Sequence, residues 1–488
     1  MPKIKESEID FTYRMQQTYP GVFRSIGTTL KCDVCKKIVT GKKLHSVKQH
    51  METKAHMEAA ERQLGTSNNS SGSATSPLGK QMCQMFLQAN IPLKKLSHPA
   101  VREFFERNIA TEEPIPSEST LRRKFVPELY QEKIEELRLK AEGRYIWASI
   151  DETTDTEQRQ VANFIFGVLG DKEETGKAYL FNMATVEFTN AQTMSQFFND
   201  SLMLLYPKGI QYDKVLLVVT DAAAYMCAAM NGLKTLYPKM LHITCFSHGL
   251  HRMAEFVRSK FTSVNELISS TKAVFVKAPS RRNVFKQVAP DIALPPSPCI
   301  TRWTTWLRAA IYYCDNFETV KKVVDTFDDD DSEAIRKAKN LFKQTKIKTD
   351  LAFIKCNFEA LINATVKFET QGLELKESVE TIEAIRNSLK AMQSKQYHEK
   401  LEKILDRNKG FKSLRAIYEV LYEAREPLEE YVKNLSPQEL MHFKYAPVSS
   451  ADVERSFSAY SATLTEKRRS FSFDNLKQHL IVYCNQGQ

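Results

Sequence analysis

Short apolar runs separated by polar turns mark the middle of the chain, and each run has the length of a strand. The first three runs follow one another closely, and the polar segment between the first two predicts a hairpin. The fourth and fifth runs are each preceded by a segment with apolar residues at helical spacing. The expected strands cover 145–150, 161–169, 178–188, 214–220 and 241–244. This succession predicts an α/β core that begins at about residue 143.

Helical periodicity dominates the chain on both sides of these strands. Residues 78–142 carry apolar side chains at helical spacing, and residues 333–435 are rich in Lys, Glu, Leu, Ala and Ile with the same period. Residues 66–77 are mostly Ser, Asn, Thr and Gly, and predict a flexible linker. The order of the core, βββαβαβ, is that of an RNase H-like fold. Its central strand is buried on both faces, which suits the unbroken Val and Leu run before Asp221.

Composition narrows the class of protein without deciding its function. The chain has 488 residues, of which 42% are hydrophobic, so it is long enough for several domains with real cores. A net charge of +10 is a weak indication of nucleic-acid binding and fits an ordinary basic protein at least as well. No apolar run reaches the roughly 18 residues of a membrane span, and the first residues lack the apolar stretch of a signal peptide. Nine scattered cysteines indicate reduced thiols of the cytosol or nucleus.

A cluster of metal-ligand residues lies within residues 1–65. Cys32 and Cys35 form a C-x-x-C turn, and His50 and His56 follow in the spacing C-x2-C-x14-H-x5-H. Two cysteines in a tight turn and two histidines on one helix supply the four ligands of a structural Zn²⁺. The pattern resembles a BED-type or related C2H2 zinc finger. Lysines around it are candidates for contacts with DNA phosphates, in particular Lys36, Lys37, Lys42 and Lys43.

Two acidic residues follow the ends of predicted strands. Asp151 ends the first apolar run and Asp221 ends the fourth, and in the expected order these two strands are neighbours. One such Asp is most often a turn or helix-cap residue, but two at one sheet edge suit a pair of Mg²⁺ or Mn²⁺ ions about 3.5–4 Å apart. Glu152 is an alternative to Asp151. Asp155 lies beyond the strand and is expected to cap the turn.

Two further pairs of residues have both a structural and a functional interpretation. Cys245 and His248 form a C-x-x-H pair with no partner pair nearby, which favours a structural or DNA-contacting histidine over a metal ligand. Trp303 is by default a residue of a packed core. The functional alternative is a stacking platform for an unpaired base, with Arg302 bound to a phosphate.

Several short sequence words between residues 78 and 142 fall in register with a known pattern. They are Ala89–Leu93, His98–Arg102, Ile115–Ser117 and Leu121–Arg123. Together with the order of zinc finger, linker and helical segment, they resemble the CGG triplet-repeat-binding type of small nuclear DNA-binding protein. The resemblance covers about the first quarter of the chain. Within it, Arg122 and Arg123 either contact DNA or form a solvated helix end.

From residue 145 onward, five motifs stand in a set order. They are Asp151 after the first strand, Asp221 after the central strand, Cys245-x-x-His248, Arg302-Trp303 and Glu454-Arg455-Ser456-Phe457-Ser458. This order is similar to that of the hAT superfamily of DNA transposases. The resemblance implies a catalytic triad of Asp151, Asp221 and Glu454. Nothing local separates Glu454 from Asp452, so the resemblance alone selects it.

The resemblance also implies an activity and its partners. hAT transposases cut DNA at transposon ends through a hairpin on the flanking DNA and then transfer the strand, so two Mg²⁺ or Mn²⁺ ions held by the triad are implied. Arg302 and Trp303 would stabilise a displaced base, and Cys245 and His248 would lie near the active site and contact the DNA there. The implied partners are double-stranded DNA with terminal inverted repeats and further copies of this chain, as a homodimer or larger oligomer in the nucleus. No membrane partner is expected.

These expectations describe an α+β multidomain chain. The expected parts are a zinc finger at 1–65, a linker at 66–77, a helical DNA-binding or dimerisation segment at 78–142, an RNase H-like core at 143–304 and 441–488, and an all-α insertion at 305–440. The last part of the core includes the hAT dimerisation region. The intact triad favours an enzyme. The alternative is a nuclear DNA-binding protein, derived from a transposase, that regulates transcription without catalysis.

Overall fold

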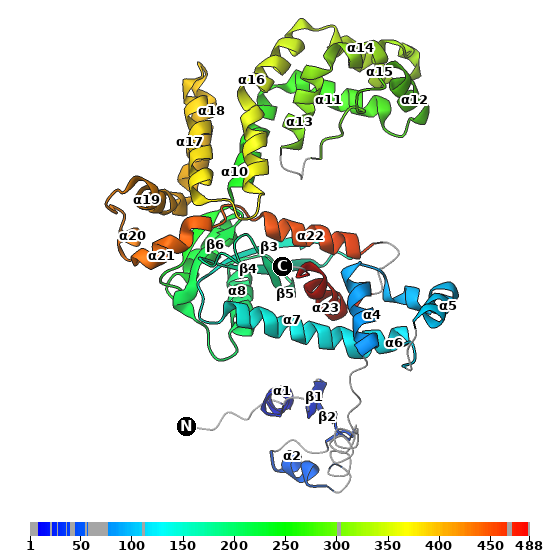
Figure 1. Cartoon of the computed structure of the whole chain (residues 1–488), viewed down its shortest axis with the longest axis vertical. Helices are drawn as coiled ribbons and strands as arrows, with labels where there is room; N and C mark the ends of the chain where they lie inside the picture. Colours follow the sequence, from blue (N-terminus) through cyan, green and yellow to red (C-terminus); the bar gives the residue numbers. More distant parts are fainter. Residues whose placement is uncertain are drawn as a thin grey trace. The chain divides into compact units, whose positions relative to one another are not determined.

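The computed structural model describes residues 8–19, 22–26, 28–35, 37–39, 44–53, 56, 77–109, 113–299, 304–465 and 471–486. The chain divides into two compact units (Figure 1). The first consists of Met1–Gln81 and Ala110–Ile115, and the second of Met82–Ile109 and Pro116–Gln488. Each unit has its own hydrophobic core. The expected linker at 66–77 lies outside the described residues except for Pro77.

The first unit is built around a short hairpin. β1 (Phe23–Ile26) and β2 (Thr29–Cys32) pair antiparallel, and helices α1 (Glu8–Thr18) and α2 (Leu44–Met51) belong to the same unit. The buried apolar side chains are Phe11, Met15, Phe23, Leu30, Val39 and Val47. Such a small core stabilises a fold only marginally, and natural modules of this size usually need a metal ion or disulfides as well.

A mixed five-stranded sheet forms the centre of the second unit, in the order β5-β4-β3-β6-β7. β3 pairs antiparallel with β4 and parallel with β6, and β7 pairs parallel with β6. The strands are β3 (Ile146–Thr154), β4 (Gln160–Val168), β5 (Tyr179–Val186), β6 (Val215–Thr220) and β7 (Leu241–Thr244). The five predicted strands are confirmed, and so is the prediction that the first and fourth are neighbours. The fold is therefore α+β, mostly helical, with one mixed sheet in this unit.

The first strand continues past the end of its apolar run. Residues 152–154 remain in β3 because they pair with residues 160–162 of β4 in the hairpin. The parallel pairing with β6 stops earlier, at Ser149 opposite Val219. The prediction that the first strand ends at Asp151 is therefore wrong for the antiparallel pairing of β3 with β4, which continues to Thr154. It holds only for the parallel pairing with β6.

Helices pack against this sheet from several parts of the chain. α22 (Ala451–Thr463) packs on β3 and β4, α8 (Ala191–Leu205) on β4 and β5, and α23 (Phe473–Cys484) on β5. The terminal helix thus packs on the core, and Asn485 exchanges two hydrogen bonds with the backbone of Leu180. The other helices before β7 are α4 (Pro77–Gln88), η1 (Leu93–Ser97), α5 (Pro99–Asn108), α6 (Glu118–Thr120), the π-helical turn η2 (Leu121–Phe125), α7 (Val126–Ala141), η3 (Tyr212–Lys214) and α9 (Ala224–Leu233).

Between β7 and α22 the described residues form helices and loops without a strand. The first of these helices, α10 (Phe246–Lys260), begins directly after β7 and packs against α16 and α18. The helical region therefore starts at Phe246, well before residue 305, at which the insertion was expected to begin. It continues with α11 (Thr262–Phe275), α12 (Pro279–Val288), α13 (Thr305–Asp315), α14 (Phe317–Asp325), η4 (Asp329–Asp331), α15 (Glu333–Phe342), α16 (Thr345–Phe368), α17 (Leu375–Ala391), α18 (Lys395–Arg407), α19 (Lys409–Glu423), α20 (Glu430–Lys433), α21 (Pro437–His442) and η5 (Phe443–Tyr445).

One glycine shows how closely these helices approach the sheet. A Cβ atom at Gly410, at the start of α19, would lie 2.1 Å from the carbonyl oxygen of His242 in β7. Only glycine therefore allows α19 to pack on this edge of the sheet at the observed distance. Across the described parts of the chain, no helix has both the length and the apolar character that a membrane crossing requires.

Candidate metal centre

Asp151 and Asp221 lie at the same end of the two central strands. The last residues paired between β3 and β6 are Ser149 and Val219, and each Asp follows two positions later. Asp151 is 8% exposed, and its Oδ1 accepts a hydrogen bond of 2.9 Å from the amide of Glu152. Ligands bind beyond the carboxyl ends of parallel strands in open α/β sheets. We therefore expect a ligand site at the carboxyl ends of β3 and β6.

Helix α22 brings Glu454 to the same place. Asn163 of β4 stands opposite Asp151 in the hairpin, so the two side chains lie on one face of the sheet. The Nδ2 of Asn163 donates a hydrogen bond of 2.8 Å to the Oγ of Ser456 on α22, and both residues are buried. The cross-strand neighbour of Asp151 thus holds α22 over Asp151.

A second buried network holds the following turns of α22. Asp155, in the turn after β3, accepts hydrogen bonds of 2.7 Å from the Tyr460 hydroxyl and from Nε of Arg159. It also accepts from the amides of Glu157 and Arg159, at 2.8 and 2.9 Å. The prediction that Asp155 caps this turn is confirmed. Burial raises the pKa of Asp155, but these hydrogen bonds outweigh burial and lower the pKa overall.

We expect Asp155→Asn to lower the free energy of unfolding by about 1–3 kcal/mol at neutral pH, because buried groups lose charge-assisted hydrogen bonds. A lowered pKa means that the carboxylate stabilises the fold above the unfolded-state pKa of about 3.9 and loses this effect as the pH falls through its own pKa. Urea unfolding of both proteins between pH 7 and pH 3 should show a difference that shrinks towards acid. A difference that is independent of pH would contradict this account.

His248, in the first turn of α10, completes a cluster with Asp151 and Glu454. One ligand atom from each of the three residues lies within 4.8 Å of the other two. The Nε2 of His248 is 3.8 Å from Oε1 of Glu454. The residues alone favoured a structural or DNA-contacting histidine here, and the family resemblance implied a position near the active site; the structure brings the ring among the carboxylates. A nitrogen and two carboxylate oxygens from three distant segments converge on one point.

Electrostatics indicate that the carboxylates of this cluster are only partly compensated by the neighbouring His248. Burial raises the pKa of Asp151 well above its ordinary value, and the charges of Asp221 and Glu454 raise it further. Burial also raises the pKa of Glu454. Burial lowers the pKa of His248, but Cys245 and the nearby carboxylates outweigh it and raise the pKa to about 9. A divalent cation would compensate these carboxylates, and their oxygen atoms suit Mg²⁺ or Mn²⁺.

Asp221 lies beside this cluster and not within it. Its Oδ1 accepts a hydrogen bond of 3.0 Å from the amide of Ala223, and the mutually close ligand atoms are those of the other three residues. Glu152, the alternative to Asp151, accepts a hydrogen bond from the Tyr225 hydroxyl, and its second carboxylate oxygen is buried without a hydrogen-bond partner. Asp221 thus contributes charge to the cluster in this conformation, whereas Glu152 is bound by a tyrosine.

Cys245 joins three segments of the site from inside the protein. Its amide donates to the carbonyl of Thr220 at 2.7 Å, and its Sγ accepts from the amide of Ser450 at 3.2 Å, just before α22. The side chain is 1% exposed, so it has no surface for the DNA contact expected from the sequence. Burial raises the pKa of Cys245, but His248 and the Ser450 hydrogen bonds outweigh it and lower the pKa to about 7.

The first unit holds a second convergence of ligand atoms. Cys32, Cys35, His50 and His56 each offer an atom within 4.8 Å of the others. The Sγ of Cys32 is 3.4 Å from Nδ1 of His56, and the Sγ of Cys35 is 3.3 Å from Nε2 of His50. Burial and the neighbouring His56 and Lys37 lower the pKa of His50, which favours the neutral ring that binds metals. Two thiols and two imidazoles fit a tetrahedral Zn²⁺.

The remaining predicted residues are described only in part. Arg302, Trp303, Lys36, Lys42 and Lys43 lie outside the described residues. Lys37 and Arg123 are exposed. Arg122 pairs with Glu118 at 2.7 Å and lies over the ring of Phe471 at 5.9 Å, so part of its donor capacity is already used.

The residues that position α22 were missed in the sequence. Asn163 is a polar residue inside an otherwise apolar run, and this could have drawn attention to it. Tyr460 and Ser450 have no such local sign. Their roles depend on contacts with Asp155 and Cys245, which are hundreds of residues away in the chain.

Comparison with known proteins assigns two parts of this chain. Residues 76–128 match the family model described as the CGGBP1 helical domain, and residues 116–274 match the Domain of unknown function DUF659, a hAT-type transposase-derived family. Over these two parts the chain resembles the CGGBP1 helical domain and a hAT-type transposase-derived family. The CGG triplet repeat-binding protein 1 of Mus musculus is 27% identical over an alignment of 127 residues, and the match covers 23% of this chain and 76% of the relative. The Homo sapiens protein of the same name matches to the same extent.

The two matched segments cover different features of this chain. The CGGBP1-like segment contains α4 to η2 and therefore Arg122 and Arg123. The DUF659 segment contains the whole five-stranded sheet with Asp151, Asp221 and His248. Glu454 lies beyond both matches, and its place beside Asp151 is a finding of the structure.

Proposed function

We propose that this chain binds DNA through its N-terminal part and cuts DNA at the cluster of Asp151, Glu454 and His248, as a metal-dependent transposase of the hAT type. The observation that carries the proposal is the convergence of these three side chains from a strand, a late helix and the helix after β7. Two neighbouring carboxylates with raised pKa values, one on β3 and one on α22, are more typical of a functional site than of a structural core.

In this proposal the mixed sheet is the centre of an RNase H-like core, and the helices between β7 and α22 are its insertion. The strand order and the directions of pairing support this interpretation. The insertion also explains how Glu454 can share a site with Asp151 although about three hundred residues separate them in the chain.

The chemistry assigns separate tasks to the residues. A divalent cation at this site would supply Lewis-acid activation of water or of a 3′-hydroxyl group. Asp151 and Glu454 would hold it, and Asp221 would add charge or a further ligand. His248 offers either a ligand nitrogen or, in its charged form, a donor for a phosphate oxygen. Phosphoryl transfer requires little from the protein beyond positioning of the reacting groups and compensation of the phosphate charge.

The N-terminal part would bring the DNA to this site. We propose that Cys32, Cys35, His50 and His56 bind a structural Zn²⁺ and that basic residues of the finger and the helical segment contact phosphates. The relatives are named for binding CGG triplet repeats. For this chain we propose double-stranded DNA as the partner, transposon ends as the substrate, self-association through the C-terminal region, and location in the nucleus.

A second function has its own support. The match to the CGG triplet repeat-binding protein favours a nuclear DNA-binding regulator that no longer cuts DNA. The two functions make the same prediction for DNA binding and opposite predictions for cleavage.

Cleavage of DNA distinguishes the two functions. Supercoiled plasmid and duplexes that carry candidate inverted repeats would be incubated with the full-length protein and Mn²⁺ or Mg²⁺. We expect nicking by the parent protein and none by Asp221→Asn or Glu454→Gln, while all three bind DNA equally. Binding without cleavage by the parent protein, in either metal, would support the regulator.

A further inference from the structure

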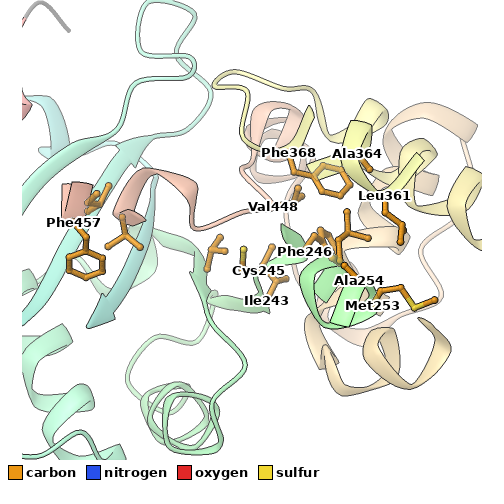
Figure 2. Close-up of a cluster of buried hydrophobic side chains, with 14 of the residues drawn as sticks. Ile243, Cys245, Phe246, Met253, Ala254, Leu361, Ala364, Phe368, Val448 and Phe457 are labelled. Carbon is orange, nitrogen blue, oxygen red and sulfur yellow. The ribbon is translucent and has the colours of Figure 1, made fainter. Parts of the chain in front are cut away.

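The long helix α16 returns from the insertion to the site at its C-terminal end. Phe368, its last residue, packs on Phe246 at the start of α10, with 6.0 Å between ring centroids. Figure 2 shows these two rings beside Val448, in the segment that leads into α22. The turn after α16, residues 369–372, therefore lies where the helix that carries Glu454 begins.

Two side chains of α22 bind this turn. Nε2 of Gln371 donates a hydrogen bond of 2.8 Å to Oδ1 of Asp452. Arg455 donates to the same Oδ1 and also to the backbone carbonyl oxygen of Glu369. The side chain of Asp452 is only 14% exposed, so it accepts these bonds in a largely protein environment. Glu454 stands in the same helical turn, between the two residues that make the contacts.

The turn is itself supported from behind. Gly372 has φ +72° and Gly176 has φ +78°, and a Cβ atom at Gly176 would lie 2.8 Å from the amide nitrogen of Gly372. The backbones of the two loops thus touch, and neither can move towards the other. Residues 369–372 therefore present Gln371 and the Glu369 carbonyl at a defined position.

The first turn of α22 is held by contacts with residues outside this helix. Its N-cap residue, Ser450, makes no capping hydrogen bond with its side chain, and the only local side-chain bond described for the first amides is from Ala451 to the Oγ of Ser449, at 3.1 Å. The first turn of a helix without a cap frays readily because its amide groups lack partners. Here the sulfur of Cys245 accepts the amide of Ser450, and the 369–372 turn binds Asp452 and Arg455. Both contacts come from elements other than α22.

We infer that the 369–372 turn is a latch through which the helical insertion sets the position of Glu454, with Gln371, Asp452 and Arg455 as positioning residues. The inference deepens the proposed function, since it concerns how the same site is assembled. It gives the helices that follow α10 a role in the site although, among the described residues, only α10 of the insertion supplies a ligand atom, through His248. A force on α16, or a ligand that shifts this helix, would therefore change the position of Glu454.

The test compares Gln371→Ala, Asp452→Ala and the double variant in the full-length protein. Mn²⁺ affinity is measured by calorimetry, and hydrogen exchange is measured at the amides of residues 453–456. We expect each single variant to weaken Mn²⁺ binding by about tenfold, as for other residues that orient metal ligands. Both should speed exchange in the first turn of α22. Because Gln371 acts through Asp452, adding Gln371→Ala to Asp452→Ala should weaken Mn²⁺ binding and speed hydrogen exchange little further.

Two further variants complete the design. Arg455→Ala should reproduce the effects of Asp452→Ala, and since this side chain is exposed its loss should leave the melting temperature nearly unchanged. Arg425→Ala is the matched control, because Arg425 is a more exposed ion-paired arginine on the helical region, bound to Glu419 and Glu423. It should change neither readout.

The outcomes separate the latch from the proposed function. If the parent protein does not bind Mn²⁺, the metal site fails, and hydrogen exchange alone decides about the latch. Faster exchange at residues 453–456 in Gln371→Ala and Arg455→Ala then still supports it. Unchanged exchange in these variants, or full additivity of Gln371→Ala with Asp452→Ala, would overturn it.

Discussion

Replacement of Asp151 by asparagine is expected to stabilise the metal-free protein and to abolish its stabilisation by Mn²⁺. Burial and the charges of Asp221 and Glu454 raise the pKa of Asp151 in the folded chain. A raised carboxyl pKa means that the folded state holds this proton more tightly than the unfolded state, so the group costs stability as the pH rises above its unfolded pKa. Removing the charge should add about 1–2 kcal/mol near neutral pH, as for other changes that relieve a strained functional site.

The measurement is thermal unfolding at pH 7.5 with and without Mn²⁺. In the parent protein, Mn²⁺ at a hundred times its dissociation constant should add about 2.7 kcal/mol. In Asp151→Asn the metal-free stability should be higher and the response to Mn²⁺ absent. The advantage of the variant should disappear below about pH 4, where the carboxyl group is protonated in both states. Asp213→Asn, an isosteric change at an exposed carboxylate, is the control. Lower stability of Asp151→Asn would contradict the account.

Removal of zinc is expected to unfold the first unit and to leave the second intact. The apolar core of the first unit is small, and its four ligand residues come from β2, the turn after it, α2 and the segment beyond. Structural Zn²⁺ in fingers contributes about 10–16 kcal/mol of apparent binding free energy at pH 7, which is far more than such a core supplies. The five-stranded sheet belongs to the other unit and has a separate core.

Chelation and Cys32→Ser should therefore have the same effect. Limited proteolysis should cut within the first unit only, and the main thermal transition should not move. Metal analysis should give one zinc per chain for the parent protein and none for Cys32→Ser. Cys299→Ser changes an exposed cysteine elsewhere and should bind zinc normally. A first unit that resists protease after chelation would contradict the zinc proposal.

The strands of the core could be predicted from the sequence because each is an apolar run bounded by polar turns. β6 is buried along its whole length, and its run of Val and Leu has no other reasonable interpretation. The continuation of β3 could not be predicted in the same way. Residues 152–154 are polar, and they remain in the strand because β4 pairs with them. Pairing between strands, and not the residues alone, decided the end of β3.

The candidate site was predicted unevenly for a similar reason. Asp151 and Asp221 could be chosen because both follow apolar runs. Glu454 required a family resemblance, since Asp452 is equally acidic in the same segment. The structure separates them physically: Asp452 faces the 369–372 turn, whereas Glu454 lies within reach of Asp151 and His248. The position of His248 depends on the direction in which α10 leaves the end of β7, and no local sequence pattern predicts that direction.

The most direct test of the metal site is anomalous diffraction from crystals of the protein soaked in Mn²⁺. The account predicts an anomalous peak bounded by carboxylate oxygens of Asp151 and Glu454, with His248 beside it, and no such peak in Asp151→Asn. A protein that shows zinc at the four ligands of its first unit but no Mn²⁺ at Asp151 would contradict the central claim. The function would then be DNA binding without cleavage.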